Sequence, residues 1–488
     1  MIFLPEITIT FFMIFTLLMG VFQPVGKRGL FSFVMTVIAL LIITTQLIIY
    51  PIHVEQWQGW QYDQLSQSLK LLISGLTLFI MVFSYQYLVQ SKIKLFEYGI
   101  LLQAVLLGVF VVCSANNFLI LFIGLELSAL PLYAMIALFH QRLGLEAAIK
   151  YFVLGALASG FILFGISLSF GASGSIDFVM LDTKLSLLGG LLITCGLLFK
   201  LGCAPFHTWV PDVYQGAPYP IITVIATLPK FAYIVAFIRL GQHGFYNGSL
   251  QYVLMFCALL SMAIGNLSAL SQDNLKRLLG YSSIAHMGYL VLAIAVGQTG
   301  YAASIFYVSL YALATAGCLC TLMLYSKANH EINMINQLAH LHAQNPFIAL
   351  ILMVIFFSMA AIPPLGGFIA KLNVFYALYQ AKFITVGIIA MLFAVFGIFY
   401  YIRLVRLMYF NDSINALKSN LASQTLSLEH YVLAIPVVLI LINGMIPNYF
   451  MQHSAELLPE SIKLTAHQSG PKSNHHVSMT KHHTTFIT

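Results

Sequence analysis

The sequence predicts an all-α polytopic membrane protein with about fourteen transmembrane helices. Hydrophobic residues make up 60% of the 488 residues and charged residues only 8%, whereas soluble domains carry about 25% charged residues. Apolar runs of about 20 residues, long enough to span a bilayer as a helix, recur along the chain. Two long apolar stretches are interrupted by prolines that lie near lysines. A soluble core of this length is therefore excluded.

The apolar runs give the expected helices in chain order. The opening run lacks a basic leader and a small-residue cleavage site, so we expect a first span and not a removed signal peptide. The seventh and twelfth helices are expected to be broken; the twelfth run is too long for one straight crossing and contains a Pro-Pro and a Gly-Gly pair. We expect spans near 3–22, 30–50, 70–90, 96–113, 116–139, 148–170, 185–204, 218–240, 250–270, 277–296, 301–325, 347–379, 383–407 and 430–450.

Two halves of the chain share features that suggest an internal repeat. The proline break at 205 recurs at 363–364, and FAYIVAFIRL resembles FGIFYYIRLV. Each unit would have five helices, and because five is an odd number the second unit would cross the membrane in the opposite orientation to the first. This is the inverted-repeat plan of secondary transporters. We expect an N-terminal three-helix segment over 1–95, repeats over 96–240 and 250–407, a linker and last helix over 408–450, and a disordered His-rich tail over 451–488.

Basic residues are distributed unequally between the expected loops. Even-numbered loops and their edges hold only Lys70, Lys184, Arg239 and Lys382, and most other basic residues lie in odd-numbered loops. Because cytoplasmic loops carry an excess of Lys and Arg, we expect both termini to face away from the cytoplasm. The positions of the basic residues thus indicate the topology. Together they give a net charge of +7, but residues scattered in this way do not indicate nucleic-acid binding.

The sequence gives no sign of a metal, nucleotide or haem site. The six cysteines lie in apolar runs without a CxxC pair, so neither a zinc site nor an iron–sulfur cluster is indicated. The tail pairs His475-His476 and His482-His483 have no fixed geometry, and we assign no metal to them. There is no Walker loop and no GxGxxG after a strand. Pumping would therefore need partner proteins, or the exchange of one ion for another.

Residues 195–231 place two lysines inside apolar sequence, which is costly in a membrane and typical of ion pathways. Pro205 is expected to free the carbonyl of Leu201, and Pro229 that of Ile225. We expect a half-helix that ends near Lys200, a hydrated break through Pro205 and His207, a short amphipathic helix to about 216, and a new helix that carries Lys230. The alternative is a kinked span whose lysines reach the headgroups.

Further ionisable groups stand in or beside the apolar spans. Glu126 is the one charge in the fifth span, and Lys371 follows the second proline break. Burial favours the neutral form of an ionisable group and a nearby opposite charge favours the charged form, so a lysine beside a movable acid can switch its proton affinity. His207 and His286 could connect lysines through water, or could simply be packing residues. Lys150 lies near a helix start, and its side chain could instead extend to the lipid headgroups.

At these residues the sequence resembles the antiporter-like membrane subunits of respiratory complex I. By that resemblance Glu126 and Lys200 would be the family's ion pair, and Lys230 its central relay lysine. Lys371 would be the terminal lysine, with Lys150, His207 and His286 as connecting positions. The His-rich tail has no counterpart in the family pattern. The runs that carry the resemblance, within about 60–450, are LELSALPLYAMIAL, FKLGCAPFHTWVPDVYQGAPYP, LPKFAYIVAFIRL, NLKRLLGYSSIAHMGYL and IPPLGGFIAKL.

The resemblance implies a proton-translocating subunit of a bacterial inner-membrane NADH:quinone oxidoreductase. Such a chain would be a non-redox part of a translocase, would bind no cofactor itself, and would contact other membrane subunits and lipid. NADH, FMN, iron–sulfur clusters and quinone would then be bound by partner subunits. Two alternatives remain open: a subunit of a multisubunit cation/proton antiporter, and a structural membrane scaffold whose charges only hold helices together.

Overall fold

The computed structural model describes residues 3–50, 54–91, 93–139, 142–326, 331–410 and 428–458. Helices form most of this part of the chain, as predicted. The elements are α1 (Leu4–Phe22), α2 (Val25–Ile49), β1 (Glu55–Trp57), β2 (Trp60–Tyr62), α3 (Gln64–Gln90), α4 (Leu95–Ser114), α5 (Phe118–Ala137), α6 (Arg142–Ser173), α7 (Lys184–Leu201), α8 (Trp209–Gly216), α9 (Tyr219–Gln242), α10 (Ser249–Leu270), α11 (Leu275–Ala295), α12 (Gln298–Tyr325), η1 (Ile335–Leu338), α13 (Leu341–Gln344), α14 (Pro346–Met359), α15 (Gly366–Gln380), α16 (Ile384–Phe410), α17 (Leu428–Val432), α18 (Ala434–Met445) and α19 (Pro447–Glu456).

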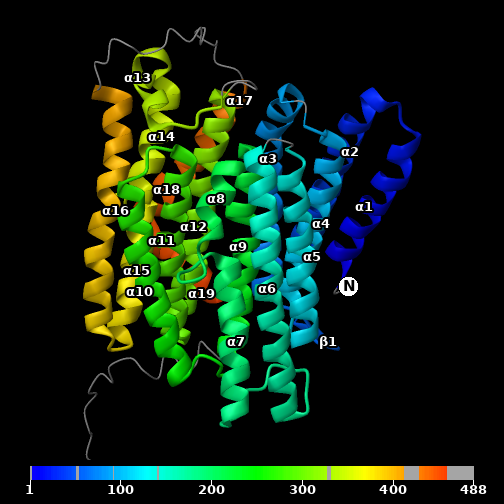
Figure 1. Ribbon diagram of the computed structural model, residues 1–488, viewed down its shortest axis with the longest axis vertical. Coiled ribbons are helices and arrows are strands. Elements are labelled where there is room, and N and C mark those ends of the chain that lie inside the picture. Colours follow the sequence, from blue (N-terminus) through cyan, green and yellow to red (C-terminus); the bar gives the residue numbers. More distant parts are fainter. Residues whose placement is uncertain are drawn as a thin grey trace, which may run out of the picture.

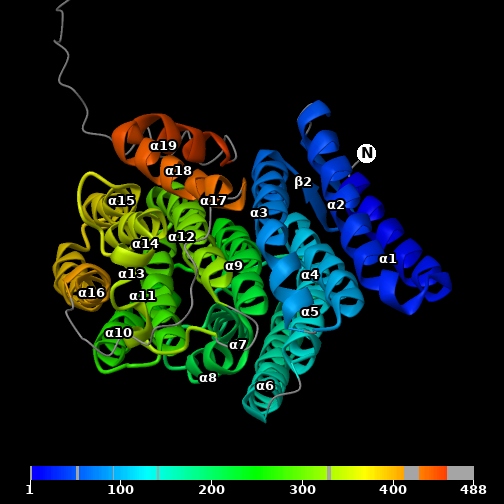
Figure 2. The same ribbon diagram turned by 90° about the horizontal axis from the view of Figure 1, so that it is seen from above.

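The long helices stand side by side, with α1 and α2 at one end of the molecule and α16 at the other (Figures 1 and 2). The helices α17 to α19 lie along one side, where α18 and α19 contact α12 (Figure 2). Other helices surround α9, α11 and α12, and the most apolar segments of these three helices are 100%, 94% and 89% buried. The most apolar segments of α1, α2, α6 and α16 are each only 33% buried. The outer helices therefore leave apolar faces for lipid or other subunits, and the polar residues of the middle helices are shielded from both.

Both predicted helix breaks are present. The first separates α7, α8 and α9, and the second separates α14 from α15. Among the described residues, 12 helices are long and apolar enough to cross a membrane, or up to 13 if the bent C-terminal pair counts as one span. A count of fourteen would also require α14 and α15 to form one crossing, so that number and the inverted relation of the two repeats stay predictions.

Three details differ from the sequence prediction. The third helix begins at Gln64, before the predicted start at 70, because Asp63 and Ser66 form a capping box. The short hairpin of β1 and β2 that precedes it was not predicted. The last span is not straight: its two parts are bent by 93° at Pro447, which cannot continue the hydrogen-bond ladder.

The predicted disordered tail begins too early, because α19 continues to Glu456. The histidine pairs of the tail and most of the predicted linker after 410 lie outside the described residues.

Candidate functional site

The first break is built around the end of α7. The helix ends at Leu201, and Gly202 follows with φ of 80°, a left-handed conformation that glycine adopts without strain. The chain then runs without helix through Pro205 and His207 before α8 begins at Trp209. This is the order of elements that the sequence predicts. Pro229, in contrast, lies inside α9 and does not interrupt it, because neighbouring helices enclose α9 on all sides and hold it together.

The structure brings Glu126 and Lys200 together. Lys200 Nζ lies 2.8 Å from Glu126 Oε1. Ser159 of α6 donates its hydroxyl hydrogen to the same carboxylate oxygen, and its Oγ lies 3.2 Å from Lys200 Nζ. The lysine side chain is only 2% exposed and the glutamate side chain 23%. Three helices, α5, α6 and α7, thus hold an ion pair between a buried lysine and a partly buried glutamate, with a hydroxyl group beside it.

Lys230 approaches the same helix end from α9. Its Nζ donates to the carbonyl oxygen of Leu201, the group that Pro205 is expected to free. The ammonium also lies 6.0 Å from the centre of the Trp209 ring. No carboxylate within the described residues forms an ion pair with Lys230, so a carbonyl and an aromatic face replace a counterion. Two buried lysines therefore meet at the last turn of α7. Lys200 belongs to this turn, and Lys230 donates a hydrogen bond to its final carbonyl.

Lys371 and His286 lie in the second half. Lys371 is buried on α15, with Nζ 5.0 Å from the centre of the Tyr289 ring. His286 is buried on α11; its Nδ1 lies 2.8 Å from the Tyr307 hydroxyl and its Nε2 lies 3.2 Å from the Tyr401 hydroxyl. Both ring nitrogens therefore have hydroxyl partners, an arrangement that allows a proton to enter at one nitrogen and leave at the other.

Lys150 and His207 are placed differently from the buried lysines. The side chain of Lys150 is 42% exposed and pairs with Glu146 at 2.7 Å and with Asp212 of α8 at 2.9 Å. Burial raises the pKa of Asp212, but hydrogen bonds from Lys150 and Arg277 outweigh burial and bring that pKa below its usual value. Lys150 thus belongs to a charged cluster at the rim of the molecule.

His207 is half-buried in the chain that links α7 to α8. Burial lowers its pKa, and a hydrogen bond with the backbone of Pro205 opposes this only in part. The imidazole is therefore neutral at pH 7, the form that can accept a proton at one nitrogen while the other donates.

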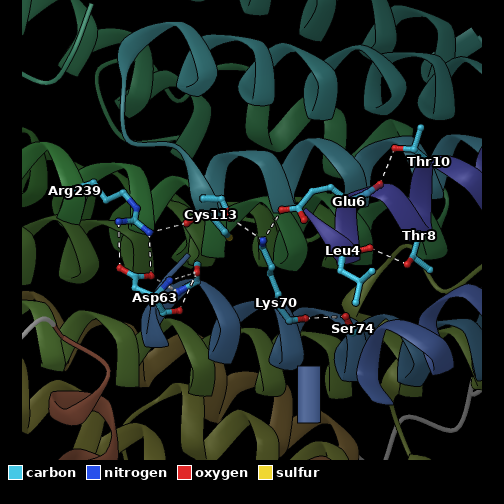
Figure 3. A network of polar contacts seen from close by, with 11 residues as sticks. Leu4, Glu6, Thr8, Thr10, Asp63, Lys70, Ser74, Cys113 and Arg239 are labelled. Carbon is cyan, nitrogen blue, oxygen red and sulfur yellow. Dashed lines mark hydrogen bonds and ion pairs between the residues drawn. The ribbon is translucent and has the colours of Figure 1, made fainter. Parts of the chain in front are cut away.

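A second buried polar cluster was missed by sequence reasoning, which placed Lys70 and Arg239 at loop edges. Lys70 of α3 forms an ion pair with Glu6 of α1 and donates to Ser114 Oγ at 2.7 Å (Figure 3). Arg239 of α9 lies 3.1 Å from Asp63 Oδ1 and 3.0 Å from the carbonyl oxygen of Cys113 (Figure 3). The signal was available: Glu6 lies in the first apolar run, and an acid in a span requires a partner.

This cluster ties α1, α3 and α4 to α9, the helix that carries Lys230. Asp63→Asn should leave the guanidinium of Arg239 buried without a counterion, at a cost of about 3–5 kcal/mol. We expect a clearly lower midpoint of thermal unfolding for the purified protein. Glu97→Gln is the matched control, because the Lys94–Glu97 pair is exposed and such pairs contribute about 0–1 kcal/mol.

A double variant separates charge burial from other effects of Asp63→Asn. Adding Arg239→Met removes the unpaired charge and should restore part of the lost stability. Equal midpoints for Asp63→Asn, Glu97→Gln and the unmodified protein would show that the Asp63–Arg239 pair does not hold these helices together.

The chain is similar in sequence to known membrane proteins. The chain matches the family described as NADH:quinone oxidoreductase/Mrp antiporter, TM, over residues 115–401. It is 39% identical over 435 residues to NADH-quinone oxidoreductase subunit N of Coxiella burnetii, an alignment that covers 85% of this chain and 90% of that protein. It is 35% identical over 479 residues to subunit N of Methylovorus glucosotrophus, covering 94% of this chain and 98% of that protein.

Solved structures show the same fold. A chain of respiratory complex I from Thermus thermophilus, solved with bound aureothin, superposes with a TM-score of 0.81 at 29% identity and covers 92% of this chain and 99% of that chain. A chain of the Mrp complex from Dietzia gives a TM-score of 0.80 at 19% identity, with coverage of 94% and 99%. At that low identity the second likeness concerns the fold alone.

Proposed function

The chain belongs to the NADH:quinone oxidoreductase/Mrp antiporter membrane-subunit family and is 35–39% identical to the two subunit N proteins above. From this premise we propose how it moves protons. It is a proton-translocating membrane subunit that assembles with other membrane subunits of complex I. In the proposal, protons pass between Glu126, Lys200, Lys230 and Lys371, with His286 as a connecting group. His207 and Lys150 serve nearer the surface.

The observation that carries the proposal is the position of two buried lysines at one broken helix end. Lys200 is paired with Glu126, whereas Lys230 is held by the carbonyl of Leu201 and the face of Trp209. A buried ammonium keeps its proton while a carboxylate lies beside it and is expected to release it when the carboxylate withdraws. Movement at the break would therefore decide which lysine carries the proton.

Energy for these steps would come from redox chemistry in partner subunits. The proposal assigns NADH, FMN, the iron–sulfur clusters and quinone to those subunits, and no redox centre to this chain. A shift of a few pKa units, at about 1.36 kcal/mol each, is comparable with moving one charge through about 100–200 mV. The chain would lie in the bacterial inner membrane, with both termini on the periplasmic side.

Two other functions predict different behaviour. A subunit of a cation/proton antiporter would exchange ions without NADH, and a structural scaffold would need its charges only for assembly. The 39% identity to a NADH-quinone oxidoreductase subunit N over 85% of this chain favours the redox-driven function.

Purification through a tag on this chain tests the proposal. We expect redox subunits with flavin and iron–sulfur absorption to co-purify, and NADH oxidation to drive proton uptake into vesicles that contain the complex. Cation-driven proton exchange by a preparation without redox subunits would identify an antiporter and contradict the proposal.

A further inference from the structure

Two small cavities lie between α8 and His286, away from the lysines at the first break. The first is lined by Tyr214, Leu279, Tyr311, Thr315, Cys318, Leu319 and Met359. The second is lined by His286, Tyr307, Leu310, Tyr311, Ala314, Ser358, Met359, Gly367 and Ala370. Each is about large enough for a water molecule. Tyr311 lines both, and Lys230 lines neither.

The first cavity is bordered by buried hydroxyl groups that lack well-aligned partners. The hydroxyls of Tyr214 and Thr315 have no partner at good hydrogen-bonding geometry within the described residues, although both lie near the Tyr311 hydroxyl. The Tyr311 hydroxyl, in contrast, lies 2.7 Å from Ser283 Oγ. Buried polar groups are nearly always hydrogen-bonded, either to protein or to ordered water. A water molecule here would satisfy Tyr214 and Thr315 and bring both into one network with Tyr311.

The second cavity extends this network to the histidine. His286 borders it together with Tyr307, whose hydroxyl contacts His286 Nδ1 at 2.8 Å. Ser358, near the end of α14, supplies a further hydroxyl group, which accepts a hydrogen bond from the backbone N–H of Gly367, the second residue of α15. Three side chains that carry polar groups, those of His286, Tyr307 and Ser358, thus line this cavity, and a buried water usually forms about three hydrogen bonds.

We propose that each cavity binds a water molecule and that Tyr311 joins them into a proton-conducting branch from α8 to His286 that does not include Lys230. The branch rests on the proposed function and adds to it a second way for protons to reach the second half of the chain. Its outer end lies on α8, the helix that carries Asp212 of the rim cluster. Hydroxyl groups and water can pass a proton along without becoming charged for long, because each both donates and accepts.

The test uses Tyr311→Phe in the assembled complex, reconstituted in sealed vesicles. NADH oxidation and proton uptake are measured side by side, with NADH oxidation repeated in the presence of an uncoupler. We expect proton uptake per NADH to fall, and by less than with Lys230→Met because the route through Lys230 remains, while uncoupled NADH oxidation shows that the complex is intact. Tyr98→Phe is the control, because Tyr98 is also buried but lies on α4, away from both cavities.

A second variant covers the case in which Tyr311→Phe does not assemble. Thr315→Val keeps the shape of the side chain and removes one water ligand from the first cavity, and it should give the same loss in smaller measure. Unchanged proton uptake with either variant, in an intact complex, would overturn the branch. Lys230→Met measured in parallel separates the two claims: if it abolishes uptake while Tyr311→Phe does not, only the branch is wrong, and if it too is without effect, the proposed function fails.

Discussion

A complex that carries Lys230→Met in this chain is expected to lose most of the proton translocation that passes through the chain. Lys230 is only 2% exposed. Methionine has a similar volume and an unbranched side chain, so α9 should keep its packing in the variant. It cannot bind a proton or donate to the carbonyl of Leu201. Loss of a group that transfers protons typically slows the step that it serves by on the order of 10²–10⁴-fold, so uptake should fall to the share that the branch through Tyr311 carries. The measurement is proton uptake per NADH in sealed vesicles.

The control for this variant is Lys184→Met at the exposed start of α7. It removes the same charge from a neighbouring helix without touching the buried lysines, so proton uptake should be unchanged. Normal uptake with Lys230→Met and normal electron transfer would contradict the relay role.

Lys200→Arg distinguishes a relay from a scaffold. Arginine keeps the positive charge and can pair with Glu126, so a scaffold should tolerate it if the complex assembles. A guanidinium cannot lose its proton in a protein, and a relay at this position should therefore stop. We expect assembled complex in which proton transfer through Lys200 falls to at most about 10⁻² of its normal rate, with a corresponding loss of proton uptake.

Glu126→Gln is the complementary change. It removes the counterion of Lys200 at 2.8 Å but keeps hydrogen-bonding groups beside Ser159. If the pair switches the lysine between two proton affinities, uptake should fall with this variant as well. Full uptake with both Lys200→Arg and Glu126→Gln would favour the structural scaffold.

The sequence predicts the helices and both breaks well because the signals are local. An apolar run of bilayer length specifies a helix by itself, and Pro205 with Gly202 ends α7 where expected. The Glu126–Lys200 pair is also accessible from sequence, since each residue is an isolated charge in an apolar run and such charges need partners. The structure places their side chains in contact.

Features that depend on packing between distant segments are not accessible in this way. Pro229 looks like a helix breaker, yet the enclosure of α9 keeps the helix continuous. Lys150 resembles the buried lysines in sequence, but its side chain lies at the rim beside Asp212. The partners of Lys70 and Arg239 come from residues 64 and 176 positions away, so no local pattern marks them.

A structure of the assembled complex with water molecules resolved inside this chain tests the central claim most directly. The account predicts ordered water that connects the region of Lys200 and Lys230 at the first break with His286 and Lys371 at the second. Close apolar packing between these groups, with the ammonium groups turned toward the lipid headgroups, would contradict it.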